Sequence, residues 1–147
     1  MSTIELGSEK IDVYNVKIFR YSWLDRFIYS VQIYQNERKV AEYKSIEAKD
    51  KAELMKILKD RLSRERRFLD KLSFDEKDVK QIYSGREGCM CGCRGNYYEH
   101  EKQIKKLYKT MKQFEGGGVE YYPSHEGKIY TVRKPNVDRQ YTAYLKD

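Results

Sequence analysis

The chain has 147 residues, with 30 Lys and Arg against 23 Asp and Glu, and a formal net charge of +7 at pH 7. This length fits one domain that buries its own core without disulfides or a metal. No run approaches the roughly 18 apolar residues of a membrane-spanning helix, which excludes a helical membrane protein. Only 39% of the residues are hydrophobic, but 14 Tyr, 5 Phe and 1 Trp argue against disorder, because disordered chains are poor in aromatics.

The cysteines and the first residues both indicate a reducing compartment. Cys89, Cys91 and Cys93 form an odd set at alternate positions, which is a poor framework for disulfides. The opening segment from Met1 to Leu6 lacks the charged and apolar regions of a secretory signal. We therefore expect a cytoplasmic protein, whose positive charge favours anionic partners such as nucleic acid or phosphate-bearing ligands.

The first third of the chain has the period-two alternation of strands. Phe27, Tyr29, Val31 and Ile33 alternate with their neighbours over residues 26–34. We predict an antiparallel meander of three strands over residues 11–19, 26–34 and 39–46, with a tight hairpin at residues 35–38.

The period then changes to that of a helix. Leu54, Leu58 and Leu62 begin an apolar stripe that predicts a long amphipathic helix over residues 49–72, packed against the sheet. Residues 73–76 fit a capping box and predict a short helix, whereas residues 79–83 alternate like a strand. The pattern leaves both interpretations open for this segment.

A second amphipathic helix is predicted over residues 99–114, and the glycines at 116–118 end it. Short strands follow at residues 119–122, 128–133 and 139–145. The predicted fold is therefore α+β: residues 1–147 form a single domain with an antiparallel sheet made from both ends of the chain, and two main helices pack on it.

The segment from Tyr83 to Tyr98 is the most unusual part of the sequence. Its four glycines permit positive φ and close approach by a ligand. Arg86 and Arg94 provide guanidinium groups suited to phosphates, Tyr83 provides a stacking face, and Asn96 can pair with the edge of a base. We interpret the segment as a site for a phosphorylated, base-containing ligand; the alternative is a compact loop whose small thiols only pack against the domain.

Metal binding and catalysis have weaker support in the sequence. The Cys-x-Cys-x-Cys spacing, even with His100, does not match the separated ligand pairs of structural zinc sites, although a zinc-binding loop stays an alternative. His100 and His125 lie in no nucleophile or metal motif, and His100, beside Glu99 and Glu101 at a helix start, is expected to be exposed. We predict no enzymatic activity, no cofactor and no metal.

Basic and aromatic clusters suggest a second class of function. Residues 61–67 and 102–112 are rich in Arg and Lys and would suit a nucleic-acid-binding module, as would an aromatic sheet face around Tyr21 and Trp23. Solvated helix faces and an ordinary covered sheet explain the same residues. A third alternative is an inhibitor that binds a host protein.

The Lys- and Tyr-rich composition and the motif Tyr-x-Gly-Arg-x-Gly-Cys-Met-Cys-Gly-Cys-x-Gly-Asn-Tyr resemble small proteins of tailed phages. In size and layout the chain is similar to the Thoeris anti-defence sponges. That resemblance implies a β-sheet core with helices, a homo-oligomer, and capture of cyclic ADP-ribose-type signals without cleavage. It also implies a site of arginines, an aromatic and an asparagine, for which the matching types here are Arg20, Tyr83, Arg86, Arg94, Asn96 and Arg133.

The sequence therefore predicts a non-enzymatic phage anti-defence protein of the host cytoplasm. It would bind and sequester a nucleotide-type immune messenger, act as a homo-oligomer and make no contact with membranes.

Overall fold

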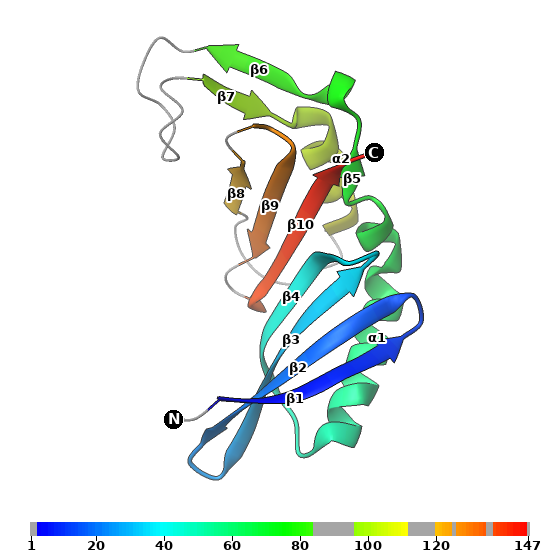
Figure 1. Ribbon diagram of the computed structural model, residues 1–147, viewed down its shortest axis with the longest axis vertical. Helices are drawn as coiled ribbons and strands as arrows, with labels where there is room; N and C mark the ends of the chain where they lie inside the picture. The colour runs from blue at the N-terminus through cyan, green and yellow to red at the C-terminus, as the bar shows by residue number, and fades with distance from the viewer. Residues whose placement is uncertain (1–2, 84–95, 112–119, 125, 135–136, 147) are drawn as a thin grey trace.

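A computed structural model describes residues 3–83, 96–111, 120–124, 126–134 and 137–146 (Figure 1). The strands in chain order are β1 (Thr3–Ile11), β2 (Tyr14–Trp23), β3 (Arg26–Gln35), β4 (Arg38–Glu47), β5 (Ser73–Phe74), β6 (Lys80–Tyr83), β7 (Asn96–Glu99), β8 (Glu120–Pro123), β9 (Ile129–Lys134) and β10 (Arg139–Leu145). The helices are α1 (Lys51–Asp70), α2 (Glu101–Met111) and the short 3₁₀ turn η1 (Glu76–Asp78).

The main sheet joins the two ends of the chain. Its strand order is β1-β2-β3-β4-β10-β9-β8, all antiparallel, and β5 adds a short parallel pairing to β10. Strands β6 and β7 form a separate hairpin that lies across the end of the C-terminal strands (Figure 1). The predicted α+β class, with an N-terminal meander continued by C-terminal strands, is confirmed.

The meander has four strands, whereas three were predicted. The predicted first strand at residues 11–19 was wrong at its start, because it runs across the turn between β1 and β2. Asp12, with a φ of 54°, turns the chain between β1 and β2. Strand β1 was not predicted. It lies at the edge of the sheet, and its residues Gly7, Ser8, Glu9 and Lys10 are too polar to show an alternation of apolar and polar side chains. The hairpin predicted at residues 35–38 is present, with positive φ at both Asn36 and Glu37, as a type I′ turn requires.

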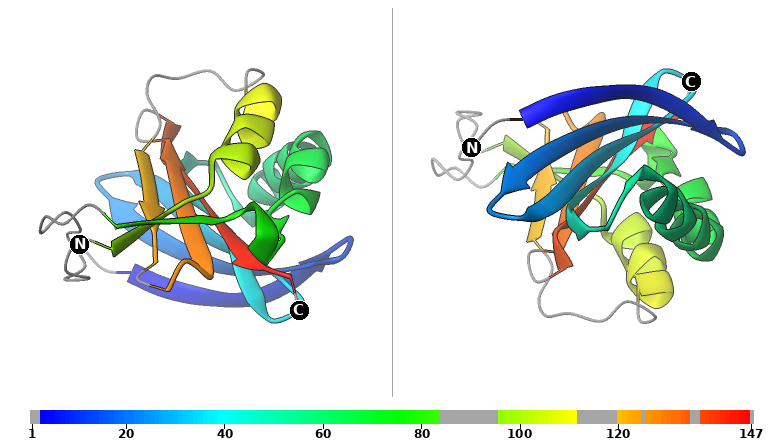
Figure 2. Two further views of the ribbon diagram at one scale, coloured as in Figure 1. Left: turned by 90° about the horizontal axis from the view of Figure 1, so that it is seen from above. Right: turned by 90° about the horizontal axis from the view of Figure 1, so that it is seen from below.

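Helix α1 begins at an N-cap, where the Asp50 carboxylate accepts a 2.9 Å hydrogen bond from the Glu53 amide. Its buried stripe includes Leu54, Leu58 and Leu62, and it packs on the sheet as predicted. Both helices lie on the same side of the curved main sheet (Figure 2). The side chains of Val16, Ile18, Val31, Ile33 and Tyr141 face α1 and are fully buried.

The segment that the sequence left ambiguous is mostly extended. η1 occupies Glu76–Asp78 and β6 follows it, so the alternation at residues 79–83 indicated the correct structure. The three predicted C-terminal strands are also present as β8, β9 and β10. Within the described part of the chain, no helix is long and apolar enough to cross a membrane.

Candidate functional site

The sheet face turned away from α1, here called the open face, carries a continuous polar row. The strand registers place directly opposed residues side by side across seven strands, in the order Ser8, Lys17, Gln32, Glu42, Gln140, Arg133 and Glu120. Opposed residues of antiparallel strands point to the same face. No described helix lies on this side of the sheet (Figure 2).

Strands β4 and β10 separate at one end of the sheet, beside the C-terminal end of α1. They pair only between Tyr43–Ala41 and Arg139–Tyr141, and beyond Tyr141 the strand β10 pairs with β5 instead. A groove of about 350 Å³ lies at this divergence, here called the β4–β10 groove. Its lining combines apolar side chains with polar ones: Gln35, Asn36, Arg38, Val40, Leu69, Asp70, Leu72, Ser73 and Tyr144.

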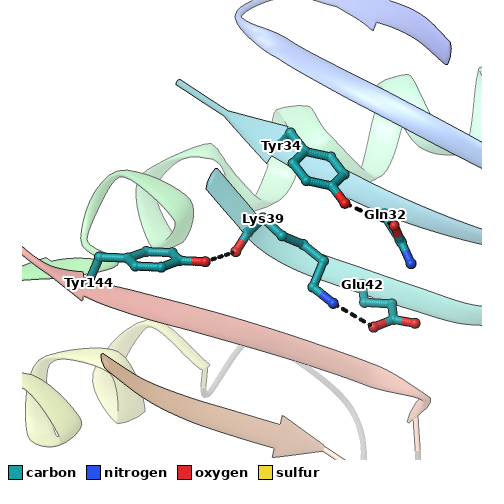
Figure 3. Close-up of polar contacts among 5 residues, drawn as sticks. All are labelled: Gln32, Tyr34, Lys39, Glu42 and Tyr144. Carbon is teal, nitrogen blue, oxygen red and sulfur yellow. Dashed lines mark hydrogen bonds and ion pairs between the residues drawn. The ribbon is translucent and has the colours of Figure 1, made fainter. Parts of the chain in front are cut away.

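Tyr144 bridges the two strands that border the groove. Its hydroxyl donates a 2.7 Å hydrogen bond to the backbone carbonyl of Lys39 (Figure 3). Burial raises the pKa of Tyr144, so the hydroxyl keeps its proton and remains a donor at neutral pH. The Arg38 guanidinium lies 5.2 Å from the centroid of the same ring. The groove is therefore bordered by a cation–aromatic pair.

A second cation–aromatic pair lies on the open face. Lys17 Nζ is 5.6 Å from the Tyr34 ring centroid, and the Tyr34 hydroxyl donates to Gln32 Oε1 over 3.0 Å (Figure 3). Between the two pairs, Lys39 Nζ lies 3.4 Å from a Glu42 carboxylate oxygen. Lys17, Arg38 and Lys39 thus place three cations around two half-buried tyrosine rings.

The residues predicted from the sequence are distributed over different parts of the fold. Tyr83 and Asn96 are directly paired in the β6–β7 hairpin, at the end next to the segment that connects the two strands, so the fold does bring these two positions together. Arg86 and Arg94, between them in the chain, lie outside the described residues, as do Cys89, Cys91 and Cys93. Their predicted roles stay predictions.

Arg20 and Arg133 lie on opposite faces of the sheet. Arg133 belongs to the polar row of the open face, where its Nη1 is 3.9 Å from Glu120 Oε2. Arg20 lies on the α1 side and stacks on Phe27, with its guanidinium carbon 4.5 Å from the ring centroid. A ligand on one copy of the chain therefore does not meet both arginines.

The predicted basic helix faces are partly paired with acids. On α1, Arg64 pairs with Asp60 at 3.0 Å and Arg66 pairs with Asp12. On α2, Lys105 pairs with Glu101 at 2.9 Å, and Lys102 Nζ lies 3.5 Å from Asp78. These pairs neutralise part of the positive charge on which a nucleic-acid site at the helices would depend.

Glu65 is the most buried acid on the described part of α1. It is 1% exposed and accepts hydrogen bonds from the hydroxyls of Tyr43 and Tyr141 and from Arg139 Nη1, the last at 2.9 Å. Burial raises the pKa of the Glu65 carboxyl, although these hydrogen bonds and the charges of Arg139 and Arg61 act in the opposite direction. This cluster joins α1 to β4 and β10 and holds the sheet beneath the open face.

His100 is also buried, so the expectation of an exposed ring was wrong. It is 1% exposed and packs against Phe74, Tyr121 and Tyr130, with ring centroids 4.7, 6.0 and 4.6 Å away. Neither ring nitrogen has a hydrogen-bond partner among the residues that the structure describes, and burial lowers the pKa of His100 to about 4. His100 is thus a neutral member of the aromatic core at neutral pH.

Sequence reasoning missed the β4–β10 groove. In the sequence, Arg38 and Asn36 belong only to the predicted hairpin at residues 35–38, and Tyr144 only to the predicted strand at residues 139–145. No local pattern in the sequence marks it, because the groove arises where β10 changes its partner from β4 to β5. Comparison of the chain with protein-family models, with curated proteins and with solved structures gave no match.

Proposed function

We propose that this protein is a non-enzymatic binding protein that captures and sequesters a nucleotide-type anion. The observation that carries the proposal is the β4–β10 groove, where the Arg38 guanidinium lies over the Tyr144 ring and polar side chains share the lining with Val40, Leu69 and Leu72. A groove of this size falls within the range of small-molecule sites.

The chemistry of the lining fits the two parts of a nucleotide. Arg38 supplies positive charge for a phosphate, and guanidinium–phosphate contacts are among the stronger hydrogen bonds in proteins. The Tyr144 ring and the side chains of Leu69 and Leu72 supply apolar surface for a base. Asn36 and Asp70 add amide and carboxylate groups that can pair with the polar edge of that base.

The wider biological role comes from the sequence resemblance. A Thoeris-type sponge would retain an immune messenger without changing it, work as a homo-oligomer and act in the cytoplasm of a phage-infected host. The hairpin bearing Arg86 and Arg94 is the second place where such a ligand would contact the protein. The pairing of Tyr83 with Asn96 supports this part of the proposal because it sets both residues at the base of that loop.

Isothermal titration calorimetry with AMP and ADP-ribose tests the proposal, with inorganic phosphate as the fragment control. We expect Arg38→Ala to weaken nucleotide binding at least tenfold, since one charge-assisted hydrogen bond contributes about 1.5–3 kcal/mol. Arg64→Ala is the matched control, because Arg64 is an exposed arginine on α1 that pairs with Asp60.

The double variant Arg86→Ala/Arg94→Ala locates the site. Loss of binding in this variant with normal binding in Arg38→Ala would move the site from the groove to the hairpin. Absence of heat with either nucleotide in the wild-type protein would contradict the proposed function.

A further inference from the structure

We infer that the outer face of α1 and α2 binds double-stranded nucleic acid through its phosphates, without reading its sequence. The inference does not use the β4–β10 groove and assigns the chain a second binding activity. The observation that carries it is the distribution of charge over the fold. The two helices carry nearly all of the net positive charge, whereas the rest of the chain is almost neutral.

The difference in charge can be counted from the exposed residues. On α1 and α2 together, ten exposed Lys and Arg residues are balanced by only four exposed acids, which leaves a net charge of +6. The charges of Arg61 and the buried Glu65 cancel. The whole chain has a formal charge of +7, so all other residues together contribute +1. Both helices lie on the same side of the main sheet, and the charge therefore belongs to one side of the molecule (Figure 2).

Four of these exposed cations form no ion pair with the described part of the chain: Lys56, Lys59 and Arg67 on α1 and Lys109 on α2. Lys56, Ser63 and Arg67 follow one another at spacings of seven and four residues, which places them in one line along the helix, opposite the buried stripe. From Lys56 to Arg67 this line is about 16 Å long, since each helical residue adds 1.5 Å. That length corresponds to about five nucleotide steps along a duplex.

Helix α2 adds its lysines beside the C-terminal part of α1. A pocket of about 190 Å³ is lined by Asp70 of α1 and by Gln103 and Lys106 of α2, so the two helices are neighbours there. Asp75 and Asp78 line the same pocket and offset the positive charge at this end. The uncompensated charge therefore lies over the middle of α1 and the C-terminal half of α2.

The helical face is charged but not apolar, which decides the kind of partner. None of the large apolar side chains that are exposed in the described part of the chain lies on α1 or α2. Helices that bind membrane surfaces insert an apolar face, and protein–protein interfaces have an apolar or aromatic centre. A phosphate backbone requires neither, because cations that neutralise phosphates gain affinity by releasing counterions.

The composition of α1 favours a duplex over a single strand. Its only aromatic residue is Phe68, which is fully buried, so unpaired bases have no ring on this helix on which to stack. A duplex has the higher density of phosphates and releases more counterions for each cation that it contacts. Phosphate contacts carry no sequence information, so we expect duplexes of different sequence to bind equally.

Fluorescence anisotropy tests the inference with labelled twenty-base-pair duplexes, namely two DNA duplexes of unrelated sequence and one RNA duplex. A DNA single strand of the same length and vesicles that contain phosphatidylserine are the alternative partners. We expect the two DNA duplexes to bind within about twofold of each other and more tightly than the single strand. The logarithm of affinity should fall with the logarithm of salt concentration with a slope of about −3.6, as expected for four neutralised phosphates.

Two triple variants make the test specific to this face. Lys56→Gln/Lys59→Gln/Arg67→Gln removes three of the four cations without an ion pair. It should lower duplex affinity at least tenfold at low salt and reduce the slope to about −1. Lys10→Gln/Lys44→Gln/Lys128→Gln is the matched control, because it removes the same charge from exposed lysines outside the helices and should keep the slope of the wild type. Circular dichroism of both variants shows whether the fold is retained.

Equal losses of affinity in the two triple variants would overturn the inference, because the net charge of the whole chain would then explain binding. Failure of all three duplexes to bind, or tighter binding of the single strand, would also overturn it. So would binding to the vesicles without binding to a duplex. Neither triple variant changes a residue of the groove, so calorimetry with AMP tests the proposed function separately on the same proteins.

Discussion

The Tyr144 hydroxyl donates a hydrogen bond to the Lys39 carbonyl at the point where β10 and β4 cease to pair. This single bond spans 105 positions of sequence and closes one side of the β4–β10 groove. The same ring lies beneath Arg38, so one residue both supports the groove and lines it.

Tyr144→Phe separates these two roles. The phenylalanine keeps the ring but loses the bond to the Lys39 carbonyl, so we expect the free energy of unfolding to fall by about 1 kcal/mol. Nucleotide affinity should fall less than in Tyr144→Ala, because the stacking surface remains. Urea denaturation and calorimetry on both variants measure the two effects, and equal affinities in the two variants would show that the ring does not contact the ligand.

Glu65→Gln tests the buried cluster beneath the sheet. The amide cannot satisfy two tyrosine hydroxyls and Arg139 as the carboxylate does, so we expect a loss of about 2–4 kcal/mol in the free energy of unfolding at pH 7. Asp60→Asn is the control, because Asp60 is an exposed acid on the same helix. Chemical denaturation measures both, and equal stability of the two variants would mean that the cluster contributes little.

Burial of His100 is expected to make the free energy of unfolding depend on pH. The pKa of its ring is about 4 in the folded protein and about 6.5 in the unfolded chain, so the unfolded state binds the proton more readily. The free energy of unfolding therefore has its full value, as far as this group is concerned, above pH 6.5. It decreases by about 3 kcal/mol as the pH falls toward 4.

His100→Phe removes that titration, so the difference in unfolding free energy between wild type and variant should change by this amount between pH 7 and pH 4. Carboxylates titrate in both proteins and cancel in the difference. A difference that is constant with pH would show that His100 is protonated equally in both states.

Gly127→Ala probes the contact between the β6–β7 hairpin and the main sheet. Gly127 has a φ of 72°, and an added Cβ would lie 2.6 Å from ring carbons of Tyr98 on β7. Gly7→Ala is the matched control, since Gly7 also has a positive φ, of 96°, but open space around it. We expect both variants to lose stability through backbone strain and Gly127→Ala to lose about 1–3 kcal/mol more through overpacking. Equal thermal shifts would show that the Tyr98 ring moves aside without cost.

Local patterns predicted most of the fold. The alternation from Phe27 to Ile33 and the leucine stripe of α1 both identify their elements, because burial of one face requires those periods. Strand β1 has a bulge between Glu5 and Gly7 and a polar edge sequence, and both interrupt the period-two alternation from which a strand is predicted.

The buried polar residues were harder to recognise. Glu65 lies among the basic residues of the segment at 61–67, which suggests a solvated face, yet it follows Leu62 by three positions and precedes Leu69 by four. That spacing places it on the apolar stripe. His100 is flanked by two glutamates that point elsewhere, and its burial depends on Phe74 and Tyr130 from distant parts of the chain.

The β4–β10 groove depends on long-range pairing alone. It exists because β10 changes its partner from β4 to β5, and no local pattern in the segments around Arg38, Ser73 or Tyr144 records that change. Sequence reasoning instead favoured the glycine- and arginine-rich loop, because its composition is unusual over a short stretch.

Native mass spectrometry of the protein purified from an expressing cell tests the central claim most directly, with Tyr144→Ala prepared in parallel. The account predicts that the wild-type protein carries or takes up added ADP-ribose or AMP, with a mass increase equal to one nucleotide per chain, and that Tyr144→Ala does not. The same spectra give the number of chains per particle. Wild-type protein that gains no nucleotide mass, or a Tyr144→Ala variant that gains as much as wild type, would contradict the groove as a nucleotide site.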